Sequence, residues 1–128
     1  MKTLLATIFL CLSMYSNYDE DPVILEGVWT DYWYPTGVEG DVDYLDTMKI
    51  SITDDLIEIS CLNRDEYLFN NISYTDGILT FTMENTIDPS EQFFVYYSLT
   101  LLEDKNTMKG SIINSKRVVN PIKWTRVK

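Results

Sequence analysis

Residues 25–34, Leu-Glu-Gly-Val-Trp-Thr-Asp-Tyr-Trp-Tyr, organise this chain. Aromatic and β-branched side chains in such a run suit a pleated strand with one buried face. We interpret the segment as the first strand of a small antiparallel β-barrel, in which Trp29 fills one end. The rest of the chain is expected to supply the strands that close around this indole ring.

Downstream of this segment, apolar residues recur with a period of two rather than 3.6. Met48, Ile50 and Ile52 alternate with polar residues, which is typical of a sheet with one face in the core and one in solvent. Asp76-Gly77 is the sharpest turn signal, because both residues tolerate the positive φ of tight hairpins. The expected strands are 24–34, 44–52, 56–62, 67–74, 78–84, 92–102, 107–113 and 119–127.

These runs predict an all-β fold, an eight-stranded antiparallel up-and-down β-barrel. The short turns lead us to expect that each strand pairs with its neighbour in sequence. Closure into a barrel removes the exposed strand edges that favour aggregation. A barrel of this size holds either packed side chains or one small ligand.

The N-terminus has the layout of a secretory signal or lipoprotein leader, with a positively charged start and an apolar run. That run is shorter than the roughly 20 residues that span a bilayer. Cleavage at Ser13 or Ser16 and lipidation of Cys11 are alternatives. The expected units are a leader at 1–16, an acidic tether at 17–23 and the barrel at 24–128. We therefore expect the protein to be secreted, periplasmic or lipid-anchored at the cell surface.

Composition argues against several functions. The formal net charge is −10 with scattered cations, so a nucleic acid is not an expected partner, and a membrane is expected only through a lipid on Cys11. The chain has no histidine, which excludes Ser-His-Asp and Cys-His catalysis and histidine-ligated zinc. A lone Cys61 is interpreted as a small buried apolar residue.

Carboxylates are abundant, but none are paired at a spacing that suggests acid–base catalysis. We therefore expect no enzyme activity and no cofactor. Acidic residues cluster in the first long loop, and their spacing matches no EF-hand; we interpret the cluster as a solvated loop rather than a metal site. Its members are Glu39, Asp41, Asp43 and Asp46.

Two segments resemble a known family. Gly27-Val28-Trp29 resembles the G-x-W opening of lipocalin and calycin β-barrels, and residues 122–127 resemble their last-strand segment. The layout is similar to small secreted lipocalin-like proteins of bacteria, over residues 24–128. The resemblance implies that Arg126 packs on Trp29 as the floor of the barrel. A cation–π contact of this kind is worth roughly 0.5–2 kcal/mol, and Gly27 allows the backbone to approach closely there.

The resemblance also implies a ligand in the barrel mouth. Trp33 shares the strand parity of Trp29, so it is expected to face inward, nearer the open end. The other rings that could line an apolar cavity are Tyr44, Phe69, Tyr74, Phe81 and Tyr97. Alternatively, these rings fill the interior and leave no cavity.

Asp31 lies on the same inward parity as the two tryptophans. A buried carboxylate without a partner is costly, so it must find one or take up a proton. We expect an ion pair with Arg126 or Lys123, or a bulge that turns Asp31 outward. The functional alternative is a polar anchor for the head group of a ligand.

Two functions remain from the sequence. The first is a secreted or surface-tethered binding protein for a small apolar or amphipathic ligand in the barrel mouth. The second is a barrel with a filled core that acts through its outer surface on a protein partner, as an interaction or inhibitor module. Exposure of Tyr32, Tyr34 and Tyr96 together would favour the second.

Overall fold

The computed structural model describes residues 21–33, 44–85 and 94–127. One turn of 3-10 helix, η1, precedes eight β-strands. The bounds are η1 Pro22–Leu25, β1 Gly27–Trp33, β2 Tyr44–Thr53, β3 Leu56–Cys61, β4 Tyr67–Thr75, β5 Ile78–Asn85, β6 Phe94–Leu101, β7 Thr107–Asn114 and β8 Val119–Val127. Among these residues, no helix is long and apolar enough to cross a membrane.

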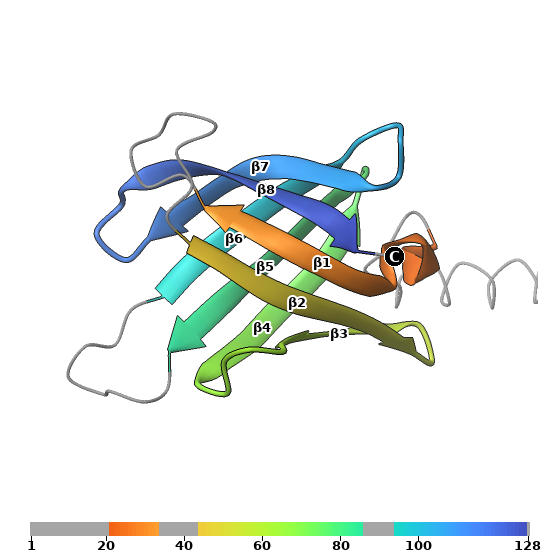
Figure 1. The fold of residues 1–128 in the computed structure, drawn as a ribbon, viewed down its shortest axis with the longest axis horizontal. Helices are drawn as coiled ribbons and strands as arrows, with labels where there is room; N and C mark the ends of the chain where they lie inside the picture. The colour runs from red at the N-terminus through yellow and green to blue at the C-terminus, as the bar shows by residue number, and fades with distance from the viewer. Residues whose placement is uncertain (1–20, 34–43, 86–93, 128) are drawn as a thin grey trace, which may run out of the picture.

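The strands form one antiparallel sheet that curls into a nearly closed barrel (Figure 1). Their order is β3-β2-β1-β8-β7-β6-β5-β4, so the last strand of the chain pairs with the first. Trp29 of β1 lies opposite Met48 of β2 and opposite Arg126 of β8. The predicted all-β, up-and-down barrel is confirmed, and the period of two is its physical basis because each strand has one face in the core.

One predicted pairing is wrong. β3 and β4 follow each other in sequence, yet they occupy the two ends of the strand order and share no ladder. We call the gap between them the seam. Within β4 the register shifts between Asn70 and Ser73, and Asn71 adopts a positive φ of 55°. Such an irregularity bends a strand locally. The barrel closes through the pairing of β1 with β8, and β3 and β4 lie at the two edges of the sheet.

The start of the first strand also differs from the prediction. Residues expected to open a strand at position 24 instead complete η1, and β1 begins at Gly27. Pro22 stands in the first turn, and the carboxylate of Asp21 accepts a hydrogen bond from the backbone N–H of Val23 at 3.0 Å. Proline in the first turn and an aspartate cap both favour a helical turn. η1 lies beside the end of β8, at one end of the barrel (Figure 1).

That end, which we call the closed end, is built around Trp29. The indole N–H donates to the backbone carbonyl of Leu25 at 2.9 Å, and both residues are fully buried. The guanidinium carbon of Arg126 lies 4.3 Å from the centre of the Trp29 ring. Gly27 has φ of 142°, which favours glycine, and a Cβ there would lie 2.9 Å from Nη1 of Arg126, so this arginine packs closely against the glycine.

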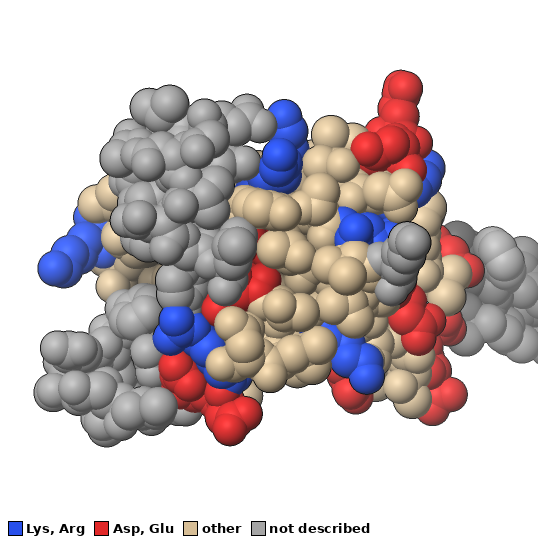
Figure 2. Space-filling view, in the orientation of Figure 1, with Lys and Arg blue, Asp and Glu red and all other residues tan. Residues whose placement is uncertain are grey.

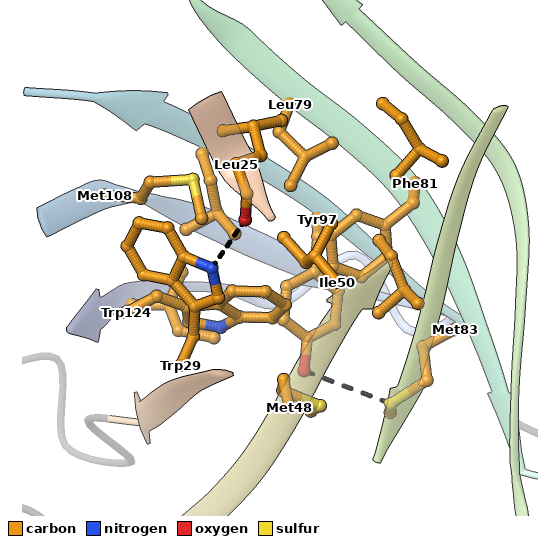
Figure 3. Close-up of a cluster of buried hydrophobic side chains, with 14 of the residues drawn as sticks. Leu25, Trp29, Met48, Ile50, Leu79, Phe81, Met83, Tyr97, Met108 and Trp124 are labelled. Atoms are coloured by element: carbon orange, nitrogen blue, oxygen red, sulfur yellow. Dashed lines mark hydrogen bonds between the residues drawn. The ribbon is translucent and has the colours of Figure 1, made fainter. Parts of the chain in front are cut away.

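Large apolar side chains fill the closed end and the middle of the barrel (Figure 3). The Phe81 and Tyr97 rings stack with centroids 4.5 Å apart, and both contact Trp124, at 5.7 and 6.1 Å. The largest side chains with no exposure are Trp29, Trp124, Tyr74, Phe81, Leu25, Met48, Ile50, Leu79, Leu99 and Met108. The interior is therefore packed from the closed end as far as Tyr97.

Candidate functional site

A cavity of about 290 Å³ lies at the opposite end of the barrel, the open end. Its walls come from the end of β1, β5 and β7 and from the start of β2, β4, β6 and β8, together with the turn before β8. The lining residues are Asp31, Asp46, Tyr67, Met83, Val95, Tyr97, Ile112, Asn114, Val118 and Asn120. The volume is at the lower limit of the roughly 300–1,000 Å³ typical of small-molecule sites. The site therefore suits one small molecule.

Asp31 supplies a buried carboxyl group to this wall, with 3% of the residue exposed. Its Oδ2 accepts a hydrogen bond from the Tyr97 hydroxyl at 3.3 Å, whereas its Oδ1 is buried without a partner. The predictions of a bulge at Asp31 and of an ion pair with Arg126 or Lys123 are wrong. Arg126 lies at the closed end, and the Lys123 ammonium lies 5.5 Å from the Tyr32 ring centre.

Burial raises the pKa of Asp31 to about 8, and the negative charge of Asp46 adds to this effect. The Tyr97 hydroxyl and the Trp124 indole N–H oppose the shift by favouring the carboxylate. Asp31 and Trp124 lie opposite each other on β1 and β8, yet within the described structure neither Asp31 Oδ1 nor the Trp124 N–H makes a well-formed hydrogen bond. At neutral pH the Asp31 carboxyl therefore holds a proton in most molecules.

Asp46 is the second acid of the cavity, and it lies directly opposite Asp31 on the neighbouring strand. It is as buried as Asp31, with 3% exposed, but it is charge-compensated. Its Oδ1 lies 3.2 Å from Nε of Arg64 and accepts from the side-chain amide of Asn63 at 3.3 Å. Arg64 also pairs with Glu66 at 3.4 Å. Arg64 thus pairs with the carboxylates of both Asp46 and Glu66, and it does not pair with Asp31.

Tyr97 connects the packed core to the cavity. Its ring stacks on Phe81, while its hydroxyl reaches Asp31 and lies 4.0 Å from the Met83 sulfur. Burial raises its pKa well above the usual value, and the charge of Asp31 acts in the same direction. The hydroxyl therefore stays protonated and serves as a donor to Asp31.

The structure divides the aromatic residues that the sequence proposes as a lining. Tyr97 and Asp31 lie in the cavity wall. Tyr74 and Phe81 are fully buried in the core, and Phe69 packs edge-on against Phe81 at 5.7 Å. The side chains of two other predicted lining residues, Trp33 and Tyr44, lie outside the described residues. The interior is thus filled with side chains toward the closed end, and it is hollow at the open end.

The prediction that Asp46 belongs to a solvated loop is wrong, because Asp46 is buried in the cavity wall. The sequence does indicate that Asp46 faces inward, because it lies on the same side of the strand as Met48 and Ile50. Its loop partners Glu39, Asp41 and Asp43 lie outside the described residues. In the part of the chain that the structure describes, no three acids or cysteines are grouped so that they could hold a metal ion.

Cys61 lies next to this acidic site, at the end of β3. It is buried, and its thiol donates to the side-chain oxygen of Asn63 at 3.2 Å. Burial, followed by the charge of Asp46, raises its pKa to about 11. The thiol is therefore protonated at neutral pH, which fits a packing role.

The outer surface carries an apolar stripe near the open end. Tyr96 of β6 lies opposite Ile113 of β7, which lies opposite Val119 of β8. All three are exposed, as is Phe94 two residues before Tyr96. We call these four residues the outer stripe. Of the three tyrosines whose joint exposure would favour an interaction surface, Tyr96 is exposed, Tyr32 is half-buried and Tyr34 lies outside the described residues.

Charge on the surface is mixed. Figure 2 shows acidic side chains at several places on one face, with lysines and arginines dispersed between them. The described cations on this face do not form a continuous basic patch. With a formal net charge of −10, the molecule attracts cations and repels anions over distances of about a Debye length.

Comparison of this chain with models of known protein families, with curated proteins and with solved structures finds no match.

Proposed function

We propose that this protein is a lipocalin-like binding protein that holds one small amphipathic molecule in the open end of its barrel. The observation that carries the proposal is the cavity of about 290 Å³ above a packed core. Apolar walls from Met83, Val95 and Ile112 suit a hydrocarbon group, and the polar groups of Asp31 and Tyr97 suit a head group. Small-molecule sites commonly combine these two features.

Two further points support the lipocalin-like identity. The chain has the G-x-W segment at Gly27–Trp29, and Arg126 packs on that tryptophan. The leader-like residues 1–16 support export, with secretion or a lipid anchor at Cys11 as the two outcomes. The proposed activity is binding without covalent chemistry or a cofactor.

The test uses the neutral dye N-phenylnaphthylamine, whose fluorescence rises in an apolar site. The dye should bind the native protein and bind at least about tenfold more weakly to the Val118→Trp variant, because the indole would occupy the cavity. Val118 lines the cavity and is 49% exposed, so the larger side chain has room to enter without disrupting the core. The measurement is a fluorescence titration.

Val119→Trp is the matched control. Val119 is the next residue, 60% exposed, and is absent from the cavity wall. This variant should bind the dye as the native protein does. Absence of dye binding to the native protein, or equal binding to both variants, would contradict the proposal.

A second candidate function is a protein-interaction or inhibitor module that acts through the outer stripe. The observation in its favour is the exposure of the four apolar residues of the outer stripe, three of which (Tyr96, Ile113 and Val119) are in register on β6, β7 and β8. Exposed apolar patches of this kind mark interaction surfaces. If the stripe pairs two copies of this chain, sedimentation velocity should show a dimer that Ile113→Lys dissociates and Lys109→Glu leaves intact. A native protein that stays monomeric at all concentrations would count against such pairing.

A further inference from the structure

We propose that the cavity selects a small organic cation, an amine with a short apolar group, whose ammonium lies between the carboxyl groups of Asp31 and Asp46. This inference rests on the proposed function, because it names the class of ligand for the same cavity. It goes further in predicting the sign of the ligand's charge.

The first argument is the count of charges at the open end. Two carboxyl groups, each 3% exposed, belong to one cavity wall. Of these two groups, Asp46 is the one that pairs with Arg64, and Arg64 is shared with Glu66. Among the described residues, the groups that act on Asp31 are Asp46, Tyr97 and Trp124, and none of these is a cation. One added positive charge would therefore complete the site.

The second argument concerns one oxygen of Asp31. Oδ1 of Asp31 is buried, and among the described residues it makes no well-formed hydrogen bond. The indole N–H of Trp124, on the paired residue of β8, favours the carboxylate form of Asp31 but also lacks a well-formed bond. Buried polar atoms nearly always have a partner. An ammonium group offers several donors, each of which gains strength when the acceptor is charged. Asp31 and Asp46 face each other across β1 and β2, and residues so paired have Cβ atoms about 4.5–5.5 Å apart. One ammonium can therefore reach both.

The third argument is the nature of the remaining wall. Met83, Val95, Ile112 and Val118 provide an apolar surface within the same cavity. An inorganic cation would leave this surface without a partner, whereas an alkyl or aryl group would cover it. The site thus fits an amphipathic monocation better than a metal ion or a neutral hydrocarbon.

Proton release follows from this arrangement. The free site keeps a proton on Asp31, since burial raises its pKa to about 8. The titratable or charged groups around it are Asp46 on β2, Tyr67 on β4 and Tyr97 on β6, with Arg64 behind Asp46. An amine arrives protonated at pH 7, since its pKa is about 10. Ion-pair formation should expel the Asp31 proton, so binding should release nearly one proton.

The experiment compares three ligands on one scaffold, phenethylamine, phenethyl alcohol and hydrocinnamate, by isothermal titration calorimetry of the full chain. The amine should bind at least about tenfold more tightly than the alcohol, because a hydrogen bond to a charged group is stronger than one between neutral groups. The carboxylate should bind most weakly. Titrations at pH 7 in phosphate and in Tris should give different enthalpies for the amine, and the difference measures the released proton.

Asp31→Asn should lower the affinity for the amine by at least about tenfold and abolish its advantage over the alcohol. Glu58→Gln is the control, because it makes the same change in net charge at an exposed position of β3; it should keep the preference for the amine. Equal or tighter binding of the alcohol or the carboxylate, or an unchanged preference in Asp31→Asn, would overturn the inference while leaving ligand binding in place. If none of the three ligands and no dye binds, the proposed function itself fails.

Discussion

Asp31→Asn is expected to stabilise the folded protein at pH 8 by several kcal/mol and to remove much of its pH dependence between pH 4 and pH 8. The native pKa of Asp31 is raised from 3.8 to about 8. Between these values the unfolded chain has released the proton and the native protein still holds it. The free energy of unfolding therefore falls as pH rises, by about 1.4 kcal/mol per pH unit.

The contribution of Asp31 is complete below pH 4, decreases through the neutral range and reaches its minimum above pH 8. Summed over this window, the loss is on the order of 5 kcal/mol, which is large beside a total stability of about 5–15 kcal/mol. Asparagine has the shape of the protonated acid, accepts from Tyr97 as Asp31 does, and carries no charge at any pH. It should therefore escape this loss.

Urea unfolding followed by circular dichroism from pH 4 to pH 9 measures both effects. The quantity to plot is the variant minus the native free energy of unfolding, because the other acids contribute equally to both proteins. This difference should rise through the neutral range, whereas Glu58→Gln should give a flat difference. Parallel native and Asp31→Asn curves would show that the carboxyl group is not protonated in the native state.

Arg126→Ala is expected to destabilise the protein by about 3 kcal/mol. The guanidinium donates to the carbonyls of Glu26 at 2.7 Å, Ile24 at 2.6 Å and Lys105 at 3.0 Å. Its carbon lies 4.3 Å from the centre of the Trp29 ring. One side chain thus joins the start of β1, the end of β8 and the turn between β6 and β7.

Thermal unfolding measures this effect, and 3 kcal/mol corresponds to a fall in Tm of about 10–20 °C for a domain of this size. Arg126→Lys keeps the charge but loses the planar fork that reaches several carbonyls, so it should fall between the native protein and Arg126→Ala. Lys116→Ala removes an exposed charge in the turn before β8 and should leave Tm within about 2 °C. A Tm of Arg126→Ala equal to that of this control would show that the closed end does not depend on the arginine.

The strands were readable from the sequence because their signal is local. The alternation around Met48 and Ile50 and the turn at Asp76-Gly77 place β2 and the β4–β5 hairpin to within one residue of their predicted bounds. The turn of η1 was missed at Pro22–Leu25. Its apolar residues resemble the start of a strand, and only the Asp21 cap and Pro22 indicate otherwise.

The seam and the polar centre of the cavity could not be predicted from local sequence patterns. Whether β3 pairs with β4 depends on the course of the whole sheet, which no short window of sequence contains. Asp31 was recognised as inward, but its partner Tyr97 is 66 positions away. Parity alone could place Asp46 inward and could not show that Arg64 would lie against it.

The seam has one mechanical consequence. In a barrel whose strands are all paired on both sides, the circumference cannot increase unless a ladder of backbone hydrogen bonds breaks. Here the described strands β3 and β4 share no ladder of backbone hydrogen bonds, so backbone pairing does not close the barrel between them. Separating β3 from β4 would break the contacts between these two strands and would leave the seven ladders of the described strands intact.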